Sequence, residues 1–455
     1  MIIKTKIIGS FIKYTVAAII ISITLFPKFP FLEVPGTFVS VRLEDFVLAF
    51  SGILLVLKIY PNLNVFIKNK LVKVILILLC AGLLSVISGV LVTKTVIPHI
   101  GFLHWLRRIE YFVPLFLGIV AVRSDKSNLA FFARIFVIVL FVIFFYGVGQ
   151  KYLHWPIIIT QNQEYSKGVA LRYVPGGHIN STFAGHYDLG TFLIIILPVL
   201  VSAFFTIKEK YTKLFLSLSI FSGLWLLVNT ASRISLVSYL ISVVFALIFI
   251  NRKKMIPLVL IISLVFTLFS ENLITRYERI FNVAKDRVER LMSFSDTFNV
   301  VYASENINLP VKNSKISTPT PTLIFEDRST NIRLNVEWPR ATRSFLKNPL
   351  LGTGYSSITL ATDNDYLRLL GEMGFVGFIA FIMVLIRIVV IILQKYPFVN
   401  NLNGIELSFV AGMLGSLPGV LINALFIDVF EASKFAIMFW LMIGFVLGIA
   451  EKHEY

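Results

Sequence analysis

The stretch LFLSLSIFSGLWLLVNTASRISLVSYLISVVFALIFI, residues 214–250, decides the fold class of this 455-residue chain. Two long apolar runs, 214–230 and 234–250, are joined by a short polar turn, and three basic residues follow at 252–254. A helix rises 1.5 Å per residue and the hydrocarbon core of a bilayer is about 30 Å thick, so about 20 apolar residues cross it. The stretch therefore predicts two consecutive membrane-spanning helices.

The composition of the whole chain agrees with this interpretation. Hydrophobic residues make up 57% and charged residues 15%, with a mean hydropathy of +0.83. A soluble domain has about 25% charged and about 45–50% apolar residues, so the composition excludes a soluble enzyme. The net charge is +17, but the basic residues lie mainly between apolar runs, where they favour anionic lipid headgroups. We therefore expect contact with membrane lipid and no nucleic-acid partner.

Further apolar runs of the same kind occur along the chain, and together they predict an all-α integral membrane protein with about twelve transmembrane helices. Residues 1–270 would carry spans one to nine, residues 271–372 a long loop, and residues 373–455 spans ten to twelve. The runs lie near 9–26, 43–59, 72–92, 104–122, 129–150, 187–206, 214–230, 234–250, 255–270, 373–394, 405–427 and 434–450.

The distribution of Lys and Arg predicts the orientation, because cytoplasmic loops collect these residues. One side of the predicted bundle collects both terminal segments and nearly all of the basic connections. We therefore expect a multi-pass protein of the cytoplasmic (inner) membrane with both termini cytoplasmic. Residues 151–186, 230–233 and 271–372 would then be extracytoplasmic, and the active face is expected there. The basic residues are Lys4, Lys6, Lys68, Lys70, Lys73, Arg123, Lys126, Lys208, Lys210, Lys213, Arg252, Lys253, Lys254, Lys395 and Lys452.

The long loop is expected to contain short helices. Residues 271–291 place apolar side chains at helical spacing among charges, which predicts an amphipathic helix at the membrane surface. Residues 293–328 lack periodicity. Ser329 or Thr330 can then cap a helix that ends near Asn348. We interpret the loop as a lid of helices.

Two arginines on the outer side are candidates for binding an anion. Arg233 ends the turn NTASR, and Arg172 opens the glycine-rich segment RYVPGGHINSTFAGH, residues 172–186. A guanidinium group pairs bidentately with phosphate oxygens, and a helix N-terminus also favours negative charge. The alternatives are an ion pair at a helix end for Arg233 and a plain turn for Arg172. His178 and His186 are candidates for acid–base groups or for hydrogen-bonded bystanders.

A second polar stretch, ATDNDYLRLLGEMGFVG, opens the tenth span at residues 361–377. Asp363 and Asp365 have the spacing with which soluble nucleotide-sugar transferases hold a divalent metal, but a polar cap at a helix start explains the same residues. We predict no metal site. Asp428 and Glu431, at the outer end of the eleventh span, are expected to pair with arginines. The segment RRIE, residues 107–110, is expected to form an ion pair at the outer end of the fourth span.

Several short motifs follow one another on the predicted outer side. In order, they resemble the O-antigen ligase and O-antigen polymerase superfamily, bacterial membrane transferases that act on polyprenyl-diphosphate-linked glycans. The resemblance covers about residues 165–450 and implies a GT-C-like helical fold. The matching pieces are Arg172 ahead of Asn180-Ser181-Thr182-Phe183, Thr230-Ala231-Ser232-Arg233, Arg333, Trp338, NPLLGTG at 348–354, DNDYL at 363–367 and EMG at 372–374.

The resemblance implies a glycosyltransferase that moves a glycan from a lipid diphosphate to an acceptor hydroxyl, without a cofactor. Arg172 and Arg233 would hold the diphosphate, whose charge grows in the transition state and is stabilised by fixed cations. Asp363 would be the general base, and Asn364 would orient a sugar hydroxyl. The partners would be the lipid-linked glycan and an acceptor glycan or glycolipid. The further substrate-binding candidates are His186, Arg333, Tyr366 for sugar stacking and Glu372 for pairing with an arginine.

One departure from the family separates the possible activities. Ligase-type members commonly place a histidine where this chain reads Thr362-Asp363-Asn364. We therefore favour a polymerase of surface-polysaccharide repeat units over a ligase that uses a different lipid or protein acceptor.

A transporter or flippase for the same lipid-linked glycan is the alternative from another class of protein. It would place polar groups and helix breaks near the midplane, whereas the spans here are expected to be mostly uninterrupted.

Overall fold

The computed structural model describes residues 2–27, 30–33, 40–158, 170–171, 173–174, 177–270, 331–359 and 361–450. Arg172, the expected helix at 271–291 and the segment 293–328 lie outside these residues.

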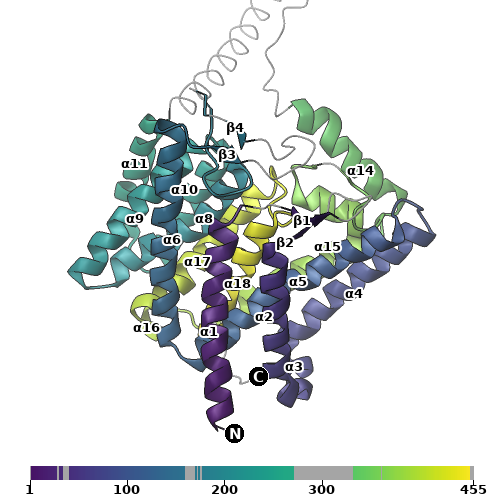
Figure 1. Ribbon diagram of the computed structural model, residues 1–455, viewed down its shortest axis with the longest axis horizontal. Helices are drawn as coiled ribbons and strands as arrows, with labels where there is room; N and C mark the ends of the chain where they lie inside the picture. Colours follow the sequence, from purple (N-terminus) through teal and green to yellow (C-terminus); the bar gives the residue numbers. More distant parts are fainter. Residues whose placement is uncertain are drawn as a thin grey trace, which may run out of the picture.

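Within the described part, the chain is a bundle of helices with two small antiparallel hairpins, which confirms the all-α fold class (Figure 1). In the hairpins, Leu32 pairs with Val41 and Ile157 pairs with Leu171. The strands are β1 (Pro30–Glu33), β2 (Ser40–Arg42), β3 (Ile157–Ile158) and β4 (Ala170–Leu171). The helices of the first half are α1 (Ile2–Leu25), α2 (Leu43–Ile59), η1 (Tyr60–Asn62), α3 (Leu63–Lys68), α4 (Lys70–Leu91), α5 (Pro98–Ser124), α6 (Ser127–Tyr152), α8 (His186–Thr206), α9 (Lys210–Asn229) and α10 (Arg233–Phe249). Those of the second half are η2 (Lys253–Met255), α11 (Ile256–Val265), η3 (Phe266–Phe269), the π-helix η4 (Arg333–Glu337), α14 (Trp338–Lys347), α15 (Asp365–Leu393), α16 (Phe398–Asn401), α17 (Gly404–Asn423) and α18 (Ser433–Ala450).

Every predicted apolar run overlaps a helix, and eight helical segments of the described chain are long and apolar enough to cross a membrane. Shorter apolar helices lie at Gly9–Leu25 and Arg233–Phe249. Charged side chains occupy the middle of α5, and the run at 255–270 is divided between α11 and η3. The membrane-protein class is therefore confirmed, whereas the number of twelve spans stays a prediction. The eight segments are Leu43–Lys68, Lys70–Leu91, Ser127–Tyr152, His186–Thr206, Lys210–Asn229, Asp365–Leu393, Gly404–Asn423 and Ser433–Ala450.

Small residues let the central helices approach closely. A Cβ on Gly118 of α5 would lie 2.7 Å from the carbonyl oxygen of Leu441 in α18, and one on Gly415 of α17 would lie 2.5 Å from the backbone nitrogen of Ala246 in α10. Close approach of this kind is what stabilises helix pairs where the surroundings are apolar. The residues of α18 are buried along its whole length, as expected of a helix that is apolar on all sides. The core therefore lies around α18, α8 and α17.

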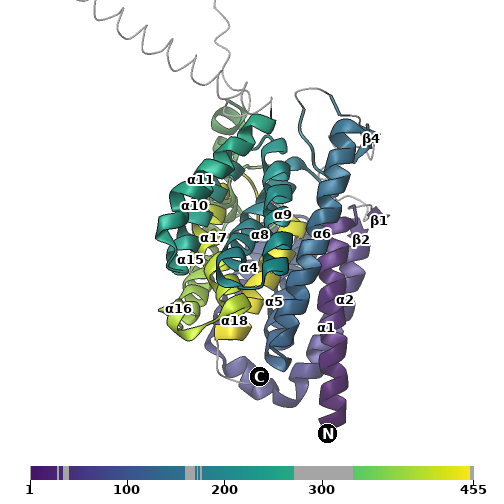
Figure 2. The same cartoon turned by 90° about the vertical axis from the view of Figure 1, so that its left-hand side faces the viewer.

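Both ends of the described chain lie at one end of the bundle (Figure 1). The opposite end, which we call the loop end, is formed by residues 177–185, 230–232, 331–364 and 424–432. Hydrogen bonds tie these segments together: the N–H of Ile179 donates to the Asn229 carbonyl at 3.1 Å, and the N–H of Asp365 donates to the Ala424 carbonyl at 2.9 Å. Figure 2 shows α8, α9 and α10 in the same part of the bundle. The polar motifs of the sequence therefore meet at one end.

The helix α15 is interrupted at Gly374, where φ is 62° and ψ is −168°. The loop at 349–354 replaces the missing helical bonds, because the N–H of Gly354 donates to the Glu372 carbonyl and the N–H of Phe375 donates to the Pro349 carbonyl, both at 2.8 Å. A Cβ on Gly352 would lie 2.3 Å from that Glu372 oxygen. The break therefore lies at the start of the predicted span 373–394, and residues 375–393 continue as an uninterrupted helix. The motif NPLLGTG has a physical role, which is to pair with the backbone of the broken helix.

Candidate active site

An ion pair between Arg333 and Asp363 lies at the centre of the loop end. Arg333 begins η4, and Asp363 precedes α15. The guanidinium donates to Oδ2 of Asp363 from Nε at 3.0 Å and from Nη2 at 2.9 Å. The side chains are 13% and 27% exposed. Burial raises the pKa of Asp363, Arg333 opposes that rise, and Asp428 adds to it. This carboxylate is partly buried but still reachable, as a general base must be.

The Asp363 turn has an unusual backbone conformation. Asp363 has a φ of 49°, in the left-handed region that a residue with a Cβ rarely adopts. The peptide N–H groups on either side of it, those of Thr362 and Asn364, donate to the carboxylate of Asp428 at 2.8 and 3.0 Å. The turn is therefore held from the α17–α18 connection.

Asn364 and Asp365 fix the start of α15. The side-chain oxygen of Asn364 accepts from the N–H of Leu367 at 3.0 Å and so caps the helix. Oδ2 of Asp365 accepts from the N–H groups of Val429 and Phe430 at 2.8 and 3.2 Å. The cap interpretation is therefore observed at Asn364, while its predicted contact with a sugar hydroxyl stays a prediction.

The two aspartates of the D-x-D motif face different partners. Asp363 pairs with Arg333, whereas Asp365 is buried against backbone amides of the α17–α18 connection. Among the residues that the structure describes, no group of three or more His, Cys, Asp or Glu side chains is placed to hold a metal ion. The geometry favours the helix-start interpretation of this motif.

Glu337 is a further carboxylate at this site that the sequence analysis did not identify. It lies four residues after Arg333. Its carboxylate is close enough to interact electrostatically with Asp363 and Asp428, and Arg340 is a second cation that acts on it. Burial and the two aspartates raise the pKa of Glu337 to about 7, against the opposing effect of the arginines. The sequence contains one indication that Glu337 lies near Arg333: the two are four residues apart, and residues at this spacing share a helix face.

The first turn of α8 adjoins the ion pair. Tyr187 lies close enough to Arg333 to hydrogen-bond with its guanidinium. The rings of His178 and His186 are in contact, with their centroids 3.8 Å apart and their planes tilted by 38°, and His186 contacts the ring of Tyr187. His186 is therefore separated from the Arg333–Asp363 pair by one residue, Tyr187.

Arg233 opens α10, which packs against α8. Its helix is capped by Ser232, whose side chain accepts from the N–H of Ser235. A Cβ on Gly190 of α8 would lie 2.8 Å from the hydroxyl oxygen of Ser235, so the first turns of α8 and α10 are in close contact. The start of α8 therefore contacts the first turn of α10 and, through Tyr187, Arg333. The position of Arg172 relative to them stays a prediction.

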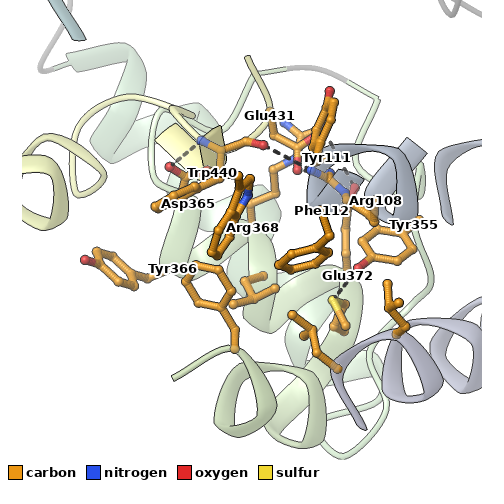
Figure 3. Close-up of a pocket in the computed structure, with 16 residues that line it drawn as sticks. Arg108, Tyr111, Phe112, Tyr355, Asp365, Tyr366, Arg368, Glu372, Glu431 and Trp440 are labelled. Atoms are coloured by element: carbon orange, nitrogen blue, oxygen red, sulfur yellow. Dashed lines mark hydrogen bonds and ion pairs between the residues drawn. The ribbon is translucent and has the colours of Figure 1, made fainter. Parts of the chain in front are cut away.

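An ionic cluster lies next to the Asp363 turn, and Figure 3 shows most of it around a cavity of about 80 Å³. Arg368 is its centre, with Nη1 3.0 Å from Asp428, Nη2 3.8 Å from Glu372 and Nε 3.7 Å from Glu431. Arg108 of α5 pairs with Glu431 as well. Although burial alone would raise the pKa of Glu431, Arg108 and Arg368 lower it to about 2.

The ionic cluster confirms several pairings expected from the sequence. Asp428, Glu431 and Glu372 each pair with an arginine, and Arg108 forms its ion pair at the loop end. The hydroxyl of Tyr366 donates to the Leu421 carbonyl at 2.8 Å, and its ring lines the cavity. Sugar stacking by Tyr366 stays a prediction.

A family described as O-antigen ligase matches residues 215–382, from α9 into α15, a region that contains Arg233, Arg333, Asp363 and Arg368. No curated protein matches the chain. The match supports the resemblance to the O-antigen ligase and polymerase superfamily, and it covers the part of the chain that contains these loop-end residues.

Proposed function

We propose that this protein is a glycosyltransferase that polymerises surface-polysaccharide repeat units at the outer face of the cytoplasmic membrane. Its donor is a glycan on a polyprenyl-diphosphate carrier, and its acceptor is a hydroxyl of another lipid-linked glycan. The observation that carries the proposal is the Arg333–Asp363 pair, which lies beside the first turn of α8 and within the O-antigen ligase match.

Asp363 serves as the general base in this reaction. The acceptor hydroxyl oxygen forms a bond to the anomeric carbon of the donor, and the bond from that carbon to the diphosphate oxygen breaks. The electron pair leaves with the diphosphate, and the hydroxyl proton passes to the Asp363 carboxylate. A positioned base of this kind contributes about 10²–10⁴-fold to a rate.

The arginines act on the leaving group. Arg233 and Arg172 bind the diphosphate and stabilise the negative charge that grows on it as the glycosidic bond breaks. Arg333 keeps the Asp363 carboxylate oriented and leaves Oδ1 for the acceptor hydroxyl. His186, at the start of α8, binds the donor next to them.

Purified protein in lipid, supplied only with a polyprenyl-diphosphate-linked oligosaccharide, tests the proposal. A ladder of regularly longer glycolipids that disappears in Asp363→Asn supports the polymerase. Transfer of a single glycan only after a different lipid or protein acceptor is added would establish the ligase activity instead. Movement of intact donor across a vesicle membrane without transfer would establish a flippase.

A further inference from the structure

Two aspartates at the loop end, Asp365 and Asp428, each accept hydrogen bonds from the backbone of the segment that carries the other. We call this reciprocal arrangement the clasp. Asp428, between α17 and α18, accepts hydrogen bonds from the N–H groups of Thr362 and Asn364. Asp365, two residues after Asp363, accepts hydrogen bonds from the N–H groups of Val429 and Phe430 in return. Each carboxylate therefore binds the chain that carries the other.

The two halves of this clasp differ in what they fix. The bonds to Asp365 end on one oxygen and hold the α17–α18 connection. The bonds to Asp428 end on both oxygens, Oδ2 for Thr362 and Oδ1 for Asn364, so they fix the peptide groups immediately before and after Asp363. With both flanking peptides fixed, the direction of the Asp363 side chain is set by Asp428.

The Asp363 turn needs such support. A residue with a Cβ is less stable in the left-handed region than in an ordinary conformation. Asp363 has a φ of 49° and lies in this region. Hydrogen bonds to a charged group are stronger than those between neutral groups, so the two bonds to Asp428 stabilise the turn.

Asp428 is itself anchored to α15. Nη1 of Arg368 donates to Oδ2 of Asp428 at 3.0 Å, and Nη2 donates to the Ile358 carbonyl at 3.0 Å. The side chains of Arg368 and Asp428 are 14% and 12% exposed, so the pair is well shielded from water. The ionic cluster thus holds Asp428 in place, and Asp428 in turn holds the Asp363 turn.

Building on the proposed function, we propose that Asp428 is a positioning residue for catalysis: it orients the Asp363 carboxylate toward the acceptor hydroxyl by binding the two peptide groups that flank it.

Asp428 also changes the charge that Asp363 experiences. The groups that act on the Asp363 carboxylate are Arg333, which lowers its pKa, and Asp428, which raises it; Glu337 is the third charged side chain that faces it. Replacing Asp428 by a neutral residue therefore lowers the pKa of Asp363, and the acidic limb of the rate profile moves to lower pH. A residue with only a structural role would leave that limb in place.

The test compares Asp428→Asn with the matched variant Asp365→Asn in the full-length protein in lipid. An asparagine at 428 keeps one acceptor oxygen and turns its NH₂ group toward the N–H of Thr362 or of Asn364, so the clasp around Asp363 opens. An asparagine at 365 keeps an oxygen that accepts both bonds. We expect Asp428→Asn to lower kcat at least 30-fold, to change KM for the lipid-linked donor less than threefold, and to shift the acidic limb by about half a pH unit or more to lower pH. We expect Asp365→Asn to keep kcat within fivefold.

A kcat of Asp428→Asn within threefold of the wild type would overturn the proposal, and so would a loss of activity with an unmoved acidic limb. If Asp428→Asn does not fold, Asp428→Glu carries the test, because it keeps the charge and lengthens the side chain. A loss of kcat of fivefold or more at unchanged donor KM then supports the positioning role, and a wild-type kcat overturns it. Full activity in Asp363→Asn would instead remove the proposed base itself, whatever Asp428 does.

Discussion

Arg333 donates two hydrogen bonds to the same oxygen of Asp363, from Nε at 3.0 Å and from Nη2 at 2.9 Å. A guanidinium that bridged both carboxylate oxygens would occupy the whole group. Among the residues that the structure describes, no hydrogen-bond donor reaches the second oxygen, Oδ1, so it can accept a proton while the first is held. The pairing therefore holds the Asp363 carboxylate in a fixed orientation and still allows it to act as a base.

Asp363→Asn is expected to lose about 10²-fold or more in glycan transfer, because an amide cannot accept the acceptor proton. Asp365→Asn is expected to lose much less, since its partners are backbone amides of residues 429 and 430. Glycolipid size analysis of both variants checks this. Equal losses that a change of divalent metal restores would instead establish a shared metal site.

Arg333→Ala is expected to move the acidic limb of the rate profile to higher pH. The guanidinium lowers the pKa of Asp363, so its removal raises that pKa and less of the base is ionised at a given pH. Arg333→Lys keeps the charge and serves as the control, with a smaller shift. A profile of Arg333→Ala that coincides with the wild type would contradict the assigned pairing.

Arg233→Ala and Arg172→Ala are each expected to abolish glycan transfer without loss of folded protein, because each removes a predicted phosphate partner. The measurements are transfer activity and recovery of monodisperse protein from the membrane. Lysine at either position restores part of the charge but not the bidentate geometry. Retained activity in both alanine variants would refute the diphosphate-binding role.

Glu337 is expected to make the stability of the protein fall as pH rises from about 5 to about 7.5. Its pKa in the folded protein is about 7, above the ordinary value of 4.5, so the folded state binds more protons than the unfolded state in this window. Glu337→Gln removes this titration and should have a flatter dependence of Tm on pH. Parallel Tm profiles of the two proteins would show that Glu337 titrates normally.

Gly352→Ala is expected to lower the yield of folded protein and its Tm strongly. Gly352 has a φ of 72°, and an added Cβ would lie 2.3 Å from the Glu372 carbonyl oxygen. Gly404→Ala is the matched control, because Gly404 has a φ of 50° but no atom within 4 Å of an added Cβ. We expect the control to lose no more than about 4 °C. Equal losses would assign the effect to backbone strain alone.

The sequence predicts the helices of this protein better than its site. Apolar length identifies each run from 9–26 to 434–450, because membrane burial imposes a long, continuous signal. The pairing of Arg333 with Asp363 is not encoded by spacing, since the two lie in different segments that only the fold brings together. Asp428 was expected to meet an arginine, and it does, but its bonds to the peptides around Asp363 depend on the exact path of two connections.

Gly374 shows another limit of reasoning from sequence. Hydropathy treats 373–394 as one span, and a single glycine within it carries no sign that the helix is broken there. The break becomes visible only when the loop at 349–354 is seen to supply the replacement bonds.

This break also determines which part of α15 the bilayer must accept. In hydrocarbon, unpaired peptide groups cost several kcal/mol each, so a newly inserted helix cannot end in the middle of the membrane without partners. Residues 375–393 are long enough to cross by themselves. The backbone groups at the break, which are the carbonyls of Gly371 and Glu372 and the N–H groups of Phe375 and Val376, become paired only when the loop has folded onto them. We therefore expect an order in biogenesis: the apolar part of α15 enters the membrane first, and the pairing at the break is completed afterwards.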